Sequence, residues 1–525
     1  MLKQTLSELE AYLQQEMREL TRETLMHRLA VDPRANPDRD YACLRCKGPL
    51  RIQEKRQNRT LPTVFGELDF QRPYGTCDRC GISYAPMDCG LGIPPTGGSA
   101  ARTELVCHAA VTTRSFEMAA GVLKKHSQIS LSDQQVRRIS ETEGKRVGRE
   151  GAEEVEAFRN GKPVVGTERA PELIVVAADG GRIQTRQPDG EVQAQEDEKE
   201  PNSPGHPESS PQEREQDKNG QKGGLWKEDL VGAVYDASPR KDPQAAEADK
   251  YAGAKAGIKT FVATLSGLEA FGWMLCVEAL KRGYAKAKDK LFLSDGDPKL
   301  RTVRQTHFHD AVFILDWYHA VEHLADCAKA AFGEATEECA RWYKRMKAKL
   351  WAGEVDAVVE AIEKESARVG KPAPKEHEGS PRVILHRNIG YFKENRKGCD
   401  YPRFRAEGWP IGSGVAEGSV KQFGMRMKGT EKFWNGFDCG LGAEEMLALL
   451  ALHRSEDGRW DDYWRRRSRP YVREPRKSRK KRNDAGASLH IRRQSPHAKP
   501  ARLIAAQHTD LPDPGKTTEI RVMRP

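Results

Sequence analysis

Residues 173–181 read LIVVAADGG, and residues 290–296 read KLFLSDG. Each stretch is a short apolar run, rich in Val, Ile, Leu and Phe, that stops at an acidic residue followed by glycine. Such a run, bounded by turn-forming residues, is typical of an interior β-strand. We therefore predict two buried strands with Asp179 and Asp295 at their carboxyl ends.

The sequence around these two stretches alternates between strand and helix patterns. Polar strands are expected at 182–186 and 226–235, which would make a hairpin, followed by a helix at about 262–288. A further apolar strand is expected at 311–315, ending at Asp316. Strand, hairpin, helix, strand, helix, strand is the order of an RNase H-like α/β core, so this fold class is predicted.

Two segments are expected to interrupt this core, whose first part spans 161–319. Residues 187–224 have only two aliphatic residues amid Pro, Gln, Glu, Asp and Gly, which predicts a disordered insertion in the hairpin. Residues 320–400 have helical patterns throughout and are predicted to form an all-helical insertion. The last part of the core is expected at 401–460.

A third carboxylate, Glu417, follows the glycine-rich turn Gly412-Ser413-Gly414 and opens a predicted helix. In an RNase H-like core Asp179 and Asp295 would lie side by side, with Glu417 facing them. Three such carboxylates favour a pair of hard divalent cations, Mg²⁺ or Mn²⁺, which can drive in-line phosphoryl transfer. Taken singly, each aspartate could instead be a turn former or helix cap, and Glu417 could complement a helix N-terminus.

The amino-terminal part carries a cysteine pattern. Cys43 and Cys46 form one Cys-x-x-Cys pair, and Cys77 and Cys80 form another about thirty residues later, with an alternating stretch between them. Two such pairs joined by a hairpin predict a zinc ribbon within residues 36–98. Four cysteine ligands leave no open position on zinc, so a structural role is expected.

Helices are expected on either side of this ribbon. Residues 1–35 place leucines and a methionine at three- and four-residue steps, which predicts an amphipathic helix that either dimerises or packs on its own domain. Residues 99–160 fit a helix-turn-helix or an ordinary helical hairpin. In the first case the second helix would present DNA-binding side chains, namely Gln134, Gln135, Arg137 and Arg138.

The 525 residues carry a net charge of +10, and one segment accounts for it. Residues 465–482 hold eleven Lys or Arg and one Glu, so residues 461–525 are predicted to be a basic disordered tail. Such a run favours a polyanion such as nucleic acid, or is simply a solvated terminus. No stretch approaches the roughly 20 apolar residues of a membrane span, and the first residues have no apolar signal core, so a cytoplasmic protein is expected.

With these motifs, the chain resembles bacterial insertion-sequence transposases of the DDE type, most closely the Kra-type group. The resemblance covers about residues 40–460 and is carried by both Cys-x-x-Cys pairs, Gly66-Glu-Leu-Asp-Phe-Gln-Arg-Pro-Tyr74, Pro86-Met-Asp-Cys-Gly-Leu-Gly92, Ser115-Phe-Glu117, Ala178-Asp-Gly180, Trp226-Lys-Glu228, Asp295-Gly296, Leu315-Asp-Trp-Tyr-His-Ala-Val-Glu-His-Leu324, Pro410-Ile-Gly-Ser-Gly414, Glu417, Lys421, Arg426-Met-Lys428 and Trp434. The long run ending at Leu324 and the turn before Glu417 are its most specific parts.

The resemblance implies that Asp179, Asp295 and Glu417 are the metal-binding triad of an enzyme that cleaves and joins DNA at transposon ends. Its partners would be double-stranded DNA, both transposon ends and target, and further copies of the chain, at least a dimer, in a nucleoid-associated cytoplasmic protein. Because the triad is intact, an active enzyme is favoured over a decayed copy.

Several other residues near the triad also have predicted roles. Asp295 is preferred to Asp297 as the second ligand. Asp316 with His319 is expected to be a buried structural pair, with a role in shaping the site or contacting DNA as the alternative. Lys421 lies one helical turn after Glu417, so it could hold a scissile-strand phosphate. The same role is expected for two further basic residues, Arg426 and Lys428, unless the helix is merely a solvated basic one.

Two alternatives remain open. A zinc-containing DNA-binding regulator, or domesticated transposase, would bind DNA without cutting it. An RNase H-like structure-specific nuclease would cut without joining.

Overall fold

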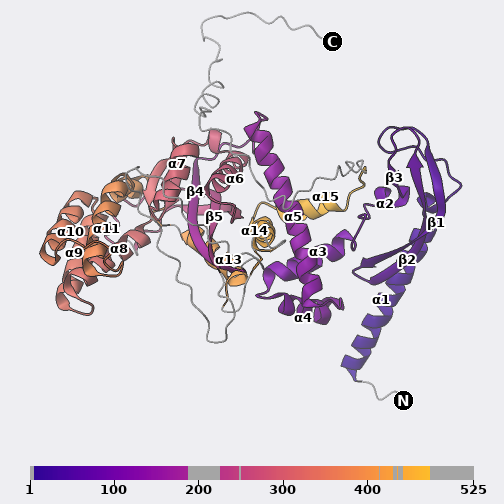
Figure 1. Ribbon diagram of the computed structural model, residues 1–525, viewed down its shortest axis with the longest axis horizontal. Coiled ribbons are helices and arrows are strands. Elements are labelled where there is room, and N and C mark those ends of the chain that lie inside the picture. Colours follow the sequence, from indigo (N-terminus) through magenta and orange to yellow (C-terminus); the bar gives the residue numbers. More distant parts are fainter. Residues whose placement is uncertain are drawn as a thin grey trace, which may run out of the picture. The chain divides into compact units, whose positions relative to one another are not determined.

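The computed structural model describes residues 5–186, 225–247, 250–412, 414–429, 434–435 and 442–472 (Figure 1). The protein is mixed α/β, and the described residues contain two separate β-sheets. Two predicted disordered segments, 187–224 and the tail beyond 472, lie outside the described residues.

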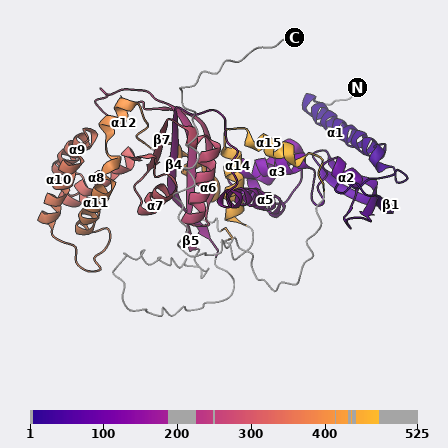
Figure 2. The same cartoon turned by 90° about the horizontal axis from the view of Figure 1, so that it is seen from above.

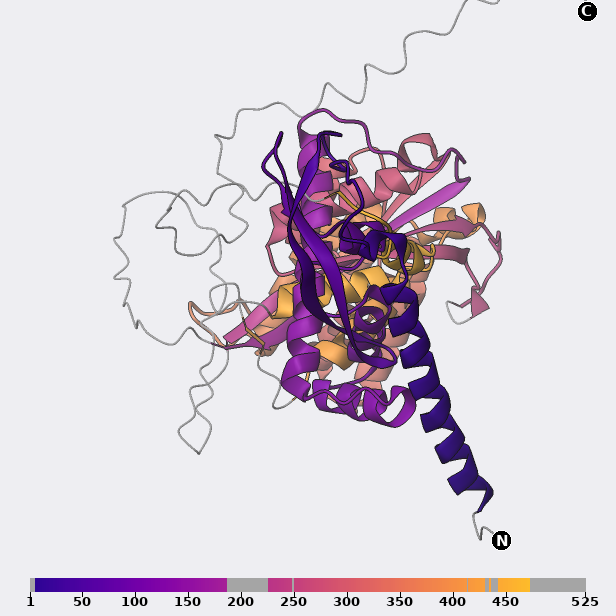
Figure 3. The ribbon, with the colours of Figure 1, turned by 90° about the vertical axis from the view of Figure 1, so that its right-hand side faces the viewer.

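The first sheet follows the predicted amino-terminal helix. Helix α1 (Leu6–Ala30) begins with a capping box between Thr5 and Glu8, and the 3₁₀ helix η1 (Pro33–Ala35) follows it. Strands β1 (Leu50–Thr63), β2 (Gly66–Cys77) and β3 (Ser83–Tyr84) then form an antiparallel sheet in the order β1-β2-β3. Figure 3 shows the long β1–β2 hairpin, with α1 extending past it toward the N-terminus.

A helical region comes next. It contains α2 (Pro86–Gly90), α3 (Ala100–Thr112), α4 (Phe116–Ser127) and α5 (Asp133–Arg159). Ser115 and Ser132 cap α4 and α5. Helix α5 has 27 residues, and its middle packs tightly on a distant helix: a Cβ added at Gly144 would lie 2.1 Å from the carbonyl oxygen of Glu445.

The second sheet has the strand order β6-β5-β4-β7-β8. Its strands are β4 (Leu173–Thr185), β5 (Leu225–Ser238), β6 (Lys255–Thr264), β7 (Asp289–Ser294) and β8 (Val312–Leu315). Strand β5 is antiparallel to β4 and β6, whereas β7 is parallel to β4 and β8 is parallel to β7.

Two sequence predictions are wrong within this sheet. The apolar and polar strands expected at 173–178 and 182–186 are one unbroken strand, because β5 pairs with β4 along its whole length. The helix expected at about 262–288 begins later, as α6 (Leu268–Lys281), followed by the 3₁₀ helix η3 (Tyr284–Lys286). Residues 255–264 form β6 instead, because Phe261, Val262 and Ala263 are buried in the sheet.

The two faces of this sheet are covered differently. Ile174, Val176 and Ala178 of β4 pack with residues of α6 and α7 (Pro298–His307). The odd-numbered residues of β4 face the other way, where Leu173 contributes to a core with Trp317. Farther along the same face, Ile183 packs with Val231 and Phe423.

A set of helices follows β8 and confirms the predicted helical segment, although its first helix begins at Trp317. These helices are α8 (Trp317–Phe332), α9 (Glu337–Trp351), α10 (Val355–Val369), α11 (Pro381–Asn395), η4 (Arg396–Gly398) and α12 (Tyr401–Glu407). Figures 1 and 2 show α8–α11 grouped on one side of the sheet, and α14 and α5 grouped on the other.

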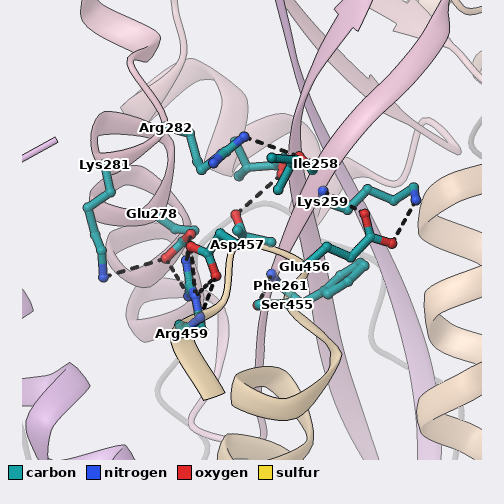
Figure 4. Close-up of polar contacts among 12 residues, drawn as sticks. Ile258, Lys259, Phe261, Glu278, Lys281, Arg282, Ser455, Glu456, Asp457 and Arg459 are labelled. Atoms are coloured by element: carbon teal, nitrogen blue, oxygen red, sulfur yellow. Dashed lines mark hydrogen bonds and ion pairs between the residues drawn. The ribbon is translucent and has the colours of Figure 1, made fainter. Parts of the chain in front are cut away.

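The last described helices are α13 (Gly414–Met427), α14 (Ala443–Arg454) and α15 (Arg459–Arg467). The predicted disorder of residues 461–525 is wrong for their first part, since α15 buries Trp460, Tyr463 and Trp464. Figure 4 shows how the chain around α15 is attached: Arg459 binds the buried Glu278 of α6, and Glu456 binds Lys259 of β6. No described helix is both long and apolar enough to cross a membrane.

Candidate functional site: a four-cysteine cluster and an acidic sheet end

The four predicted zinc ligands come together in the first sheet. The Sγ atoms of Cys43, Cys46, Cys77 and Cys80 all lie within 4.8 Å of one another. The Cys43–Cys80 and Cys46–Cys77 Sγ distances are 3.7 and 3.4 Å. These values are near the roughly 3.8 Å edge of a tetrahedron with Zn–S bonds of about 2.3 Å, so the cluster fits a structural zinc ion.

The first turn of this cluster favours a thiolate at Cys43, whereas burial and the neighbouring sulfur atoms raise the pKa of Cys80. Burial raises the pKa of Cys43, but backbone N–H groups of Cys46 and Arg45 oppose it, and the net effect lowers that pKa to about 6. Two turn residues at positive φ, Lys47 and Gly81, bring backbone N–H groups back to the carbonyl oxygens of Cys43 and Cys77. Each Cys-x-x-Cys pair is therefore closed into a compact loop around its sulfur atoms.

Asp179 lies in β4, and Asp295 directly follows the neighbouring parallel strand β7. The last pair of the β4–β7 register is Ala177 with Leu293, and each aspartate comes two residues after its member of that pair. Asp179 is two residues after Ala177 in β4, so it projects from the same face as that core residue. That the two aspartates lie side by side stays a prediction, and Asp179 lies within β4 and not at its end as expected.

The loop after β7 holds Asp295 in place. The N–H of Asp297 donates to Oδ1 of Asp295 at 3.0 Å, and the hydroxyl of Tyr391 on α11 donates to the Asp295 carbonyl oxygen at 2.8 Å. Burial raises the pKa of Asp295, the carboxylates of Asp297 and Asp316 add to the increase, and His319 opposes it. A cation bound here would relieve that accumulation of negative charge.

Glu417 lies on α13, which packs against β4 and β5. Its side chain lies outside the described residues, as does Ser413 of the preceding turn. Convergence of Glu417 with the two aspartates therefore stays a prediction.

Asp316 and His319 follow β8. Asp316 is fully buried and caps α8, where its Oδ1 accepts a hydrogen bond from the backbone N–H of His319 at 2.9 Å. The structural role expected for Asp316 is thus confirmed. The imidazole of His319 is half-buried.

A cavity of about 360 Å³ lies beside Asp295, where β4 continues past the end of β7. Its lining includes Asp295, Asp297 and Glu228, together with three basic residues, Arg182, Lys299 and Lys428. Lys299 forms an ion pair of 2.8 Å with Glu228. Acidic and basic groups in one cavity can bind cations and phosphate oxygens together.

Sequence reasoning assigned no role to Arg182, Glu228 or Lys299. The sequence held a signal for two of them. Arg182 lies three residues after Asp179 in β4, and Glu228 of β5 is the cross-strand partner of Arg182. The full pairing of β4 with β5 was not foreseen, so neither residue could be placed near Asp295.

The residues predicted to read DNA on α5 are in different environments. Gln134 and Arg138 are exposed near the start of the helix. Gln135 completes the cap of α5, accepting a hydrogen bond from the N–H of Ser132 at 2.9 Å. Arg137 forms a 2.7 Å ion pair with Glu141. Gln134 and Arg138 are the better placed of the four for an outside partner.

The basic residues predicted on α13 also differ. Lys421 and Lys428 are exposed, and Lys428 lines the cavity. Arg426, however, is only 3% exposed, and its Nε donates to the carbonyl oxygen of Ala110 at 2.6 Å. Its guanidinium lies 4.2 Å from the ring centroid of Phe116. The prediction that Arg426 holds DNA phosphates is therefore corrected: Arg426 joins α13 to α3 and α4, because its charge is enclosed by aromatic rings and backbone carbonyls.

Comparison with known proteins leaves the site to be interpreted from its own geometry. No protein-family model matches the chain, and no curated protein does either.

Proposed function

We propose that the protein is a DNA transposase that cleaves and joins phosphodiester bonds at transposon ends, using Asp179, Asp295 and Glu417. The observation that supports the proposal is the parallel register of β4 and β7, whose last pair lies two residues before Asp179 and Asp295, together with a cavity of acidic and basic walls beside Asp295. The strand order β6-β5-β4-β7-β8, with β5 running opposite to the other four strands, supports an RNase H-like core.

The roles of the chain's own groups follow from their chemistry. Asp179 and Asp295 would hold Mg²⁺ or Mn²⁺, and α13 would bring Glu417 to the same face of the sheet. When bound, a cation pair activates the attacking water or 3′-hydroxyl and stabilises the leaving oxygen. Arg182, Lys299 and Lys428 lie in the same cavity and would hold the phosphates of the strand being cut.

Recognition of the transposon ends is assigned to the amino-terminal half. The zinc ribbon and the α3–α5 region would contact double-stranded DNA, with Gln134 and Arg138 exposed at the start of α5. Pairing of two ends requires at least two copies of the chain. Helix α1 supports this, because Leu6, Leu13 and Leu20 are 72%, 51% and 57% exposed on it.

The experiment that tests the proposal is strand cleavage and joining on labelled DNA that carries the inverted repeats flanking the coding region. Wild type should cut and join in Mg²⁺ or Mn²⁺. Asp295→Asn and Glu417→Gln should abolish both steps and leave DNA binding intact. The matched control is Asp356→Asn on α10, an exposed carboxylate paired with Arg396, which should behave as wild type.

The alternatives give different outcomes in the same assay. Cutting without joining would identify a structure-specific nuclease. Tight binding of the DNA ends with no cutting in either metal would contradict an enzyme and identify a DNA-binding regulator.

A further inference from the structure

Asp229 is a buried carboxylate with no described partner. It lies in β5 and is 1% exposed, and neither of its side-chain oxygens has a hydrogen-bond partner among the described residues. Carboxylates are rarely buried in this way, because loss of hydration is normally offset by hydrogen bonds, an ion pair or a metal ion. Something outside the polypeptide is therefore expected to meet this group.

The register places Asp229 next to the acidic sheet end. Asp229 pairs with Gly181 across the β4–β5 ladder, and Asp179 pairs with Val231. Cross-strand partners project from the same face, as do residues two apart in one strand. Asp179, Gly181, Val231 and Asp229 thus share a face, and the common core of Val231 and Ile183 agrees with this.

Gly181 leaves the room that the carboxylate occupies. A Cβ added at Gly181 would lie 2.6 Å from Oδ1 of Asp229, so any larger residue would collide with that oxygen. Gly181 also lines the cavity that contains Asp295. The carboxylate of Asp229 therefore packs against a residue that forms part of the cavity wall.

The positive charge near Asp229 does not fully neutralise its carboxylate. Burial raises the pKa of Asp229, and the ammonium of Lys428, also on the cavity wall, lowers it in part. The adjacent Glu228 projects from the opposite face, where it pairs with Lys299. One partly compensating lysine leaves a need for further positive charge.

We propose that Asp229 is a fourth carboxylate ligand of the divalent-cation site, completing a row of Asp295, Asp179 and Asp229 across three adjacent strands. This inference rests on the proposed function, because it requires cations at Asp179 and Asp295. Diagonal neighbours in an antiparallel pair lie about 7–8 Å apart. Two cations about 3.5–4 Å apart, each about 2.1 Å from its oxygen ligands, span such a gap.

Cation binding to the zinc-loaded full chain tests this directly, without reference to DNA. We would titrate Mn²⁺ into wild type, Asp229→Asn, Asp295→Asn and Asp236→Asn by calorimetry, and record thermal unfolding with and without Mn²⁺. Asp229→Asn should weaken Mn²⁺ binding by about tenfold or more. It should also melt at a higher temperature than wild type without Mn²⁺, because a buried charge is gone, and gain less from added Mn²⁺.

The matched control is Asp236→Asn, the same change on the same strand, where the carboxylate pairs with Arg282 at 2.8 Å. It should keep the Mn²⁺ affinity of wild type. Weaker binding in Asp295→Asn but not in Asp229→Asn would overturn the role of Asp229 and leave the transposase proposal standing. Wild type that binds no Mn²⁺ would overturn both. Weaker binding in Asp229→Asn with no DNA cleavage by wild type would support the cation site and contradict the transposase.

Discussion

At the scale of single residues, α13 shows how little the charge of a side chain says about its role. Lys421, Arg426 and Lys428 were all expected to hold DNA phosphates. The two lysines are exposed, whereas Arg426 is buried and makes a hydrogen bond to the Ala110 carbonyl. The aromatic rings that enclose Arg426 are those of Phe116 and Trp434. Because Phe116 lies far away in the chain, the residues next to Arg426 in the sequence could not reveal that its side chain is buried.

Replacing Arg426 should therefore lower stability. In Arg426→Met the Ala110 carbonyl loses its donor, and we expect the free energy of unfolding to fall by about 1–3 kcal/mol. Denaturant unfolding measures this. Lys421→Met is the control and should stay within about 0.5 kcal/mol of wild type. Equal effects of the two changes would contradict the structural role of Arg426.

His453 should make stability depend on pH. Burial lowers the pKa of His453 to about 4, and nearby His108 and Arg454 add to the decrease. The unfolded chain, with a histidine pKa near 6.5, binds the proton more readily, so the unfolding free energy falls as pH drops from about 6.5 toward 4. Between pH 7 and pH 5 the loss from this group is about 1–2 kcal/mol.

His453→Phe tests the sign of this effect. Nδ1 of His453 has no hydrogen-bond partner among the described residues, so phenylalanine can keep the edge contact with Trp460 without losing a bond there. Unfolding free energies at pH 7 and pH 5 should differ less in this variant than in wild type. His309→Gln, at an exposed histidine, should leave the difference unchanged. A larger difference in His453→Phe would refute the assignment.

At the scale of secondary-structure elements, the sequence predicted the central strands well and their limits poorly. The apolar runs of β4 and β7 identified these strands, since interior strands are apolar on both faces, and a further apolar run identified β8 at the edge of the sheet. Gly180-Gly181 was interpreted as a turn, yet both glycines lie within β4, where Gly181 makes room for Asp229. Gly267, with φ +86, is the residue that separates β6 from α6. Local patterns cannot show which glycine serves packing and which serves a turn.

The same limit applies to the candidate site. The four cysteines and the two aspartates that follow apolar residues could be selected from local sequence alone. Arg182 and Lys299 could not, because they come near Asp295 only through strand pairing or the packing of α7, and Asp229 could not, because its place opposite Gly181 depends on strand pairing. Tyr391 was missed for the same reason, lying 96 residues from Asp295 in the chain.

Helix α11 should tune cation binding through Tyr391. Its hydroxyl donates to the carbonyl oxygen of Asp295, and its ring stacks on His323 at 3.8 Å between centroids. Tyr391→Phe keeps the stacking and removes the hydrogen bond, so we expect several-fold weaker Mn²⁺ binding and a stability loss of about 0.5–1.5 kcal/mol. Calorimetry and denaturant unfolding measure the two effects.

Tyr343→Phe on α9, at a half-buried tyrosine, is the control and should not change Mn²⁺ affinity. A loss of stability in Tyr391→Phe with unchanged Mn²⁺ affinity would show that α11 supports the fold but does not position Asp295.

The β1–β3 sheet should depend on zinc. Its four cysteines are brought together by the turns at Lys47 and Gly81, and zinc would bind thiolates that otherwise repel one another. Chelation, or Cys77→Ser, should release about one zinc per chain and speed hydrogen exchange of β1 and β2. Mass spectrometry follows both. Cys339→Ser on α9 should do neither, and undisturbed exchange in the Cys77 variant would contradict a structural metal.

At the scale of the whole chain, the C-terminal helices connect parts that are distant in sequence. Glu143 of α5 accepts hydrogen bonds from Tyr463 and Arg467, and Glu278 of α6 pairs with Arg459. The basic segment was expected to be free, yet its first residues form α15. The charge of this segment suggested a solvated tail. Its acidic partners, Glu143 and Glu278, lie far earlier in the sequence, where a local pattern cannot reveal them.

This connection matters during synthesis of the protein, because its two partners leave the ribosome at different times. Glu143 and Arg467 are 324 residues apart, and at about 5–20 residues per second that interval takes roughly 15–65 s. During that time α5 has emerged but lacks the residues that neutralise and cover its middle. For most of its synthesis the nascent chain thus carries Glu143 without the tyrosine and arginine that meet it in the folded protein. A chain that stops before residue 459 lacks α15 and leaves Glu143 and Glu278 without these partners.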